Sequence, residues 1–134
     1  MANTTFSGPV RSENGFEQVT KNATTGAFTT SATYDATIIG GVQSLSGAGA
    51  VDLTNLITEV TTTGADALTL ADGSTSGQVK IINMIVDGGD GTLTPTTFAN
   101  GTTITFDAVA ESATLVWNST IGWVATSVQG ATIA

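Results

Sequence analysis

Carboxylates and a single lysine are the side chains whose type and spacing in this sequence could support chemistry. Asp87 and Asp90 lie three residues apart in a Gly-rich segment, and Asp107 lies four residues before Glu111. Two carboxylates brought together can hydrolyse a glycosidic bond. Sugar clefts also need several aromatic platforms, and only 8 of the 134 residues are Phe, Trp or Tyr. The carboxylate pairs therefore do not predict a glycosidase.

The sequence contains no His and no Cys, which removes the usual general base at neutral pH, imidazole metal ligands and thiol nucleophiles. Lys80 is the only lysine after residue 50. Alternation along a strand could place it in an apolar setting that lowers its pKa, or near a strand end with its ammonium group in solvent. We expect the solvated position. The chain is therefore predicted not to be an enzyme and to hold no cofactor.

The run Asp87-Gly88-Gly89-Asp90-Gly91 offers hard oxygen ligands of the kind that Ca²⁺ prefers. It lacks the downstream Glu of a helix–loop–helix calcium site, and it is typical of a turn in which Gly supplies positive φ and Asp bonds locally. We therefore expect no metal site, with ion binding by Asp87 and Asp90 left open. Trp117 and Trp123 flank a second predicted turn. They either line an exposed binding end or fill the core or a subunit interface.

The composition indicates which elements must position these residues. Only 10% of the residues are charged, whereas 27 are Thr and 16 are Gly. Thr is β-branched and favours strands, and the residues that build helices are scarce. The fold class is therefore all-β, a compact β-sandwich or barrel with an extended N-terminal arm.

Three segments differ in pattern. Residues 1–30 mix isolated apolar residues with turn formers and read as an extended docking arm with one short strand near residues 16–19. Residues 31–50 form a Gly-, Ser- and Thr-rich linker or entry strand, and residues 51–134 form the β body. The residues expected to dock the arm on another surface are Phe6, Val10, Arg11 and Phe16.

Residues 79–86 form the most apolar run of the body. Ile81 and Ile85 lie on one face of the expected strand, and Ile82, Met84 and Val86 lie on the other. Apolar residues on both faces predict a strand buried on both sides, either central in a sheet or at a subunit interface. We assign the face with Ile82 to core or trimer packing.

Net charge bears on the partners. The chain carries 11 acidic and 3 basic residues, a formal charge of −8. Such a surface repels nucleic-acid phosphates and anionic membranes, so neither is an expected partner. The N-terminus carries no basic and apolar run of the secretory type, and we expect the protein to stay in the cytoplasm or assemble there.

Part of the body resembles a module of tailed-phage structural proteins. The segments that carry the resemblance are, in order, Gly77-Gln78-Val79-Lys80, an Asp-Gly-Gly turn, the run from Thr94-Pro95 to Thr105-Phe106, and a final segment made of Ala113 to Trp117 and Gly122-Trp123. The opening residues 6–16, FSGPVRSENGF, are similar to the start of small virion proteins of marine podophages.

This resemblance implies a virion protein on the capsid exterior or in a head fibre, commonly a homotrimer with a β-rich body. The chain is too short and unrepetitive for a fibre shaft, which favours a decoration or cement protein whose partner is the major capsid protein. The alternative is a host-surface or glycan-binding domain of a head or tail fibre, with Trp117, Trp123 and the acidic turn at its exposed end. A structural module of a non-viral assembly is a third possibility.

Overall fold

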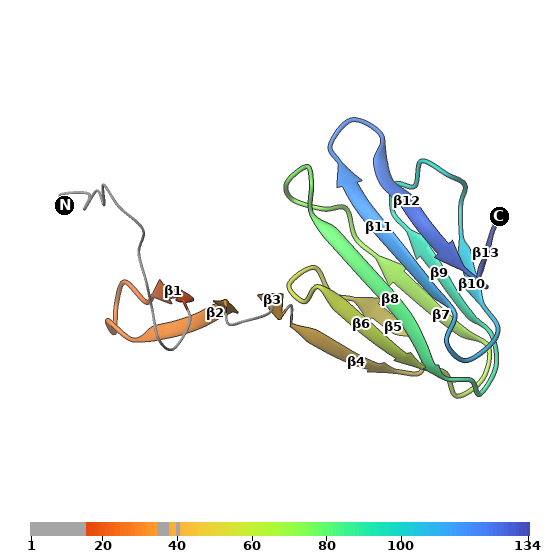
Figure 1. Cartoon of the computed structure of the whole chain (residues 1–134), viewed down its shortest axis with the longest axis horizontal. Helices are drawn as coiled ribbons and strands as arrows, with labels where there is room; N and C mark the ends of the chain where they lie inside the picture. Colours follow the sequence, from red (N-terminus) through yellow and green to blue (C-terminus); the bar gives the residue numbers. More distant parts are fainter. Residues whose placement is uncertain (1–15, 35–37, 40) are drawn as a thin grey trace. The chain divides into compact units, whose positions relative to one another are not determined.

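The computed structural model describes residues 16–34, 38–39 and 41–134, and every regular element in these ranges is a strand (Figure 1). The prediction of an all-β fold is confirmed. The chain divides into two compact units, one ending at Gly40 and the other beginning at Gly41.

The first unit contains a three-stranded antiparallel sheet in the order β1 (Phe16–Lys21), β2 (Phe28–Tyr34) and β3 (Ile38–Ile39). The Asn22 side chain shapes the β1–β2 turn, because its Oδ1 accepts the N–H groups of Thr24 and Thr25. The strand predicted near residues 16–19 is present as β1. Of the predicted docking residues, Phe16 begins this strand, whereas Phe6, Val10 and Arg11 lie outside the described residues.

The second unit consists of two five-stranded sheets that pack face to face (Figure 1). The first sheet has the order β12 (Gly122–Gln129), β11 (Ser112–Asn118), β8 (Val79–Val86), β6 (Ile57–Thr61), β4 (Val42–Ser46). The second has the order β13 (Thr132–Ile133), β10 (Ile104–Phe106), β9 (Gly91–Pro95), β7 (Asp66–Leu70), β5 (Gly49–Val51). The unit is thus a β-sandwich, which is one of the two all-β architectures that the sequence predicts.

The chain winds through this sandwich in successive turns, which we call coils; each coil contains one strand of each sheet. From β4 to β9, consecutive strands alternate between the two sheets, and the neighbours within each sheet are parallel. Parallel strands need a crossover connection, and here each crossover is a strand of the opposite sheet. Strands β10 to β13 then add in antiparallel fashion, so both sheets are mixed.

Alternation along the strands builds the core between the sheets. β8 is the central strand of its sheet, as the run of apolar residues predicts. Ile82 and Met84 point inward and are buried, whereas Val86 is 47% exposed at the end of β8. The sequence predicted core or trimer packing for Val86, and core packing within this chain is wrong.

The segment predicted as a linker or entry strand contributes directly to the sandwich. β4 is an edge strand of the first sheet, and β5 is an edge strand of the second. The polar side chain of Gln43 on β4 joins the two edges, because its Nε2 donates to the backbone oxygen of Ala50 and its Oε1 accepts the N–H of Asp52.

Candidate functional site

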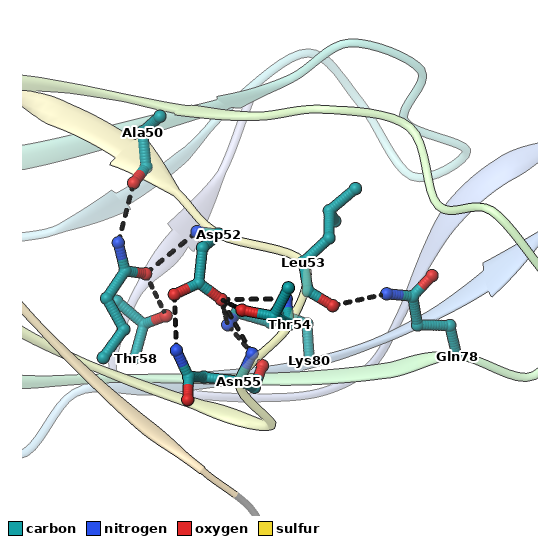
Figure 2. A network of polar contacts seen from close by, with 9 residues as sticks. Ala50, Asp52, Leu53, Thr54, Asn55, Thr58, Gln78 and Lys80 are labelled. Atoms are coloured by element: carbon teal, nitrogen blue, oxygen red, sulfur yellow. Dashed lines mark hydrogen bonds and ion pairs between the residues drawn. The ribbon is translucent and has the colours of Figure 1, made fainter. Parts of the chain in front are cut away.

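The loop between β5 and β6 carries a connected network of polar hydrogen bonds (Figure 2). Asp52 organises it. Its Oδ1 accepts the backbone N–H groups of Thr54 at 3.0 Å and Asn55 at 2.8 Å. Its Oδ2 accepts the side-chain amide of Asn55 at 2.6 Å. The carboxylate thus closes a local turn of the type that Asp favours.

Three side chains from neighbouring segments hold this loop. Lys80 Nζ donates to the backbone oxygen of Asn55 at 2.7 Å and lies 3.5 Å from Asp52 Oδ1. Gln78 Nε2 donates to the backbone oxygen of Leu53 at 2.8 Å. Gln43 Oε1 accepts from Asp52 N and from the buried Thr58 hydroxyl, both at 2.9 Å. The loop is therefore fixed at both ends.

The position of Lys80 corrects the sequence-based expectation. We expected its ammonium group in solvent, but the residue is only 1% exposed. The inward positions of β8 are Lys80, Ile82 and Met84, and the loop of residues 52–56 closes over the first of them. Nothing in the sequence around Lys80 predicts that this loop covers it, because the position of the loop depends on where β5 ends and β6 begins.

Burial and pairing shift both ionisable groups of this site. Burial lowers the pKa of the Lys80 amine, and the nearby Asp52 carboxylate offsets this only in part. For Asp52, burial acts to raise the pKa, but the hydrogen bonds from Asn55, the charge of Lys80 and the Thr54 N–H together lower it below its usual value. The result is a buried amine with an increased tendency to lose its proton, next to a carboxylate that stays ionised.

The two tryptophans do not form an exposed binding end. Trp123 is 0% exposed and Trp117 is 8% exposed. They face each other across the β11–β12 hairpin with ring centroids 5.4 Å apart, and Trp123 Nε1 donates to the backbone oxygen of Ala71 at 2.9 Å. Of the two roles predicted for the tryptophans, the exposed binding end is wrong. Both residues occupy inward-facing positions of β11 and β12, which places their rings in the core between the sheets.

The paired acidic residues take part in local hydrogen bonds, two of them through their carboxylates and two through the backbone. Asp87 Oδ1 accepts the N–H of Gly89, and the Asp90 backbone oxygen accepts the N–H of Asp66. Glu111 is nearly buried, and its Oε2 accepts the N–H of Asp107 at 2.7 Å. Within residues 16–34, 38–39 and 41–134, no group of three or more acidic side chains could hold a metal ion.

A second candidate site lies on the outer face of the first sheet. Cross-strand register aligns Val124, Val116 and Val79 in one row. The next row on this face aligns Ile81, Ile57 and Val42. All six side chains are partly or largely exposed, with Val79 at 37% and Val42 at 48%. We call these six residues the outer patch.

The sequence partly signalled this patch. The apolar residues on both faces of residues 79–86 predicted a strand buried on both sides, and Val79 and Ile81 lie at its centre. The contributions from β4, β6, β11 and β12 were not foreseen, because they depend on the parallel register of coils that are unevenly spaced in the sequence. Glu59 is the one charged residue on the outward positions of these five strands.

Comparison with known proteins assigns no family to this chain. No protein-family model and no curated protein sequence matches it. In the part of the chain that the structure describes, no helix is long and apolar enough to cross a membrane.

Proposed function

We propose that this protein is a non-enzymatic virion component that decorates and cements the exterior of a phage capsid as a homotrimer. The observation that supports the proposal is the outer patch. Six β-branched residues in two adjacent rows, left open to solvent, are the kind of apolar surface that protein–protein contacts cover. The partners would be further copies of this chain through the patch, and the major capsid protein through another surface.

The distribution of charge limits how further copies of this chain can meet at the patch. Residues 41–134 carry eight acidic residues and one basic residue, the buried Lys80. The body therefore offers no exposed base with which an acidic partner face could pair. Two copies approach each other at lowest electrostatic cost through the uncharged rows of the patch.

The mechanism is mechanical. A trimer that spans coat subunits shares buried area with each of them, and this area must be lost before the subunits separate under the pressure of packaged DNA. Assembly would take place in the host cytoplasm, with the finished protein on the capsid exterior. The buried tryptophans weigh against the alternative of a host-surface or glycan-binding domain, because they remove the aromatic platform on which it depended.

A charge in the centre of the patch tests the proposal. We expect the full-length protein to be a trimer by light scattering and Ile81→Asp to shift it to monomers. An unpaired buried charge costs about 3 kcal/mol or more, roughly a hundredfold in the dissociation constant. Thr94→Asp is the matched control, because it adds the same charge at an exposed outward position of β9 in the second sheet.

The control should remain trimeric. A monomeric wild-type protein, or equal dissociation of both variants, would remove the patch as the basis of assembly. Mass spectrometry of purified virions of the phage that encodes the chain then tests the location, and its absence from those particles would overturn the decoration role.

A further inference from the structure

The Asp52 carboxylate connects two groups that can react with each other. Its Oδ1 lies 3.5 Å from the amine of Lys80, and its Oδ2 lies 2.6 Å from the side-chain amide nitrogen of Asn55 (Figure 2). Lys80 Nζ is also 2.7 Å from the backbone oxygen of Asn55. An amine and a carboxamide are therefore held beside one carboxylate at the edge of a packed core.

We propose that Lys80 and Asn55 form an intramolecular isopeptide bond with Asp52 as the proton carrier. In this reaction Lys80 Nζ, as the free amine, attacks Asn55 Cγ. A new Nζ–Cγ bond forms, the Cγ–Nδ2 bond breaks, and Nδ2 leaves as ammonia. Asp52 Oδ1 accepts the proton that the attacking nitrogen loses, and the carboxyl group then gives this same proton to the leaving nitrogen. Atoms and charges balance without an oxidant, a cofactor or a second substrate.

The surroundings of Lys80 favour the attack. Burial disfavours the ammonium form and so raises the fraction of nucleophilic amine at neutral pH. Ile57 on β6 pairs with Ile81 on β8, so adjacent parallel strands hold the two reacting residues in a fixed relation. Nζ already contacts the backbone oxygen of Asn55, the residue whose side-chain amide it would attack.

Gly41 is a positioning residue for this arrangement. The side-chain amide of Asn55 occupies the space where a Cβ at position 41 would lie. A larger residue there would push the amide away from Asp52. The absence of a side chain at Gly41 thus leaves room for the reactive orientation of Asn55.

The product would tie the loop before β6 to the first residues of β8, closing a covalent ring through residues 55–80. A cross-link between successive coils resists their separation and restricts the unfolded chain. It would add strength to a protein under mechanical load, but the inference does not depend on the proposed capsid role.

Trypsin provides a direct test, because the chain has only three cleavage sites, at Arg11, Lys21 and Lys80. An acylated lysine is not cleaved. We expect the intact protein to be lighter than its sequence by one ammonia molecule, and the denatured protein to give an undivided fragment of residues 22–134. A wild-type protein of full mass that is cleaved after Lys80 would overturn the proposal.

Two variants separate the bond from other losses of ammonia. Lys80→Arg keeps a cation at this position but has no nucleophilic amine, and it should show the full mass and cleavage at residue 80. A succinimide at any Asn would also release ammonia, but it would persist in Lys80→Arg and would leave Lys80 of the wild type cleavable. Asp52→Asn should slow bond formation in freshly refolded protein at least tenfold; an unchanged rate would exclude Asp52 as the proton carrier. None of these readouts depends on the oligomeric state.

Discussion

At the residue scale, the stability of the sandwich is linked to pH through Asp52. Its hydrogen bonds lower its pKa in the folded chain below the ordinary value of 3.8. The folded protein therefore keeps this charge at pH values at which the unfolded chain takes up a proton. The stabilisation is fully present above the ordinary pKa and is lost as the pH falls through the lowered one.

We predict that the free energy of unfolding of the wild-type protein falls as the pH is lowered through the ordinary Asp pKa of 3.8 and below it, and that Asp52→Asn loses less over the same interval. The variant has no carboxylate at this position, so its curve should be flatter with pH; a difference in cross-linking would displace a whole curve without changing its slope. Denaturant titrations at several pH values measure both curves. Parallel curves would mean that the hydrogen bonds of Asp52 do not couple folding to its ionisation.

The residues of this site also show where sequence reasoning stops. The run of apolar residues identified the strand at 79–86 correctly, but Lys80 was expected near a strand end with its ammonium group in solvent. It did not reveal that a loop formed some 25 residues earlier covers that end of the strand. The Asp52–Asn55 turn contains no feature that distinguishes it from an ordinary surface turn until Lys80 is seen beneath it.

At the element scale, the loop after β7 packs closely against Trp117 of the β11–β12 hairpin. A Cβ at Gly73 would overlap Cγ of Trp117, and the indole of Trp117 is held between the sheets beside Trp123. An indole is rigid and has little freedom to move aside. The glycine is thus required for the backbone to pack on this ring.

We predict that Gly73→Ala destabilises the protein by about 1–3 kcal/mol through overpacking. Gly64→Ala is the matched control, because a Cβ at Gly64, in the loop between β6 and β7, meets no atom within 4 Å. The control should change stability by about 1 kcal/mol or less. Thermal or denaturant unfolding of the two variants gives the comparison, and equal effects would show that contact with Trp117 is not what limits position 73.

The arrangement of the elements was only partly predictable. The strand at residues 79–86 stands out as the most apolar run of the body, and the all-β class follows from composition. The coiled winding does not stand out, because the paired positions Val42, Ile57 and Ile81 are unevenly spaced and form no repeat. Short strands such as β5 and β13 carry too few residues to show a period.

At the scale of the whole molecule, the charge is unusually one-sided. The chain has a formal charge of −8, and in residues 41–134 the only base is the buried Lys80. Assembly through the outer patch therefore gains from apolar burial and works against repulsion between bodies of the same sign. In most interfaces rim ion pairs oppose this repulsion, but this body has no exposed base to form them.

This imbalance gives assembly a distinctive salt dependence. Raising the ionic strength from about 0.05 M to about 0.5 M shortens the Debye length from roughly 14 Å to roughly 4 Å and screens the repulsion. We predict that the trimer then persists at several-fold lower protein concentration, measured by light scattering across a dilution series at each salt concentration. A trimer that weakens with added salt would show that ion pairs hold it together. Since the two remaining bases are Arg11 and Lys21, the contact would then involve the N-terminal 40 residues rather than the apolar face of the sandwich.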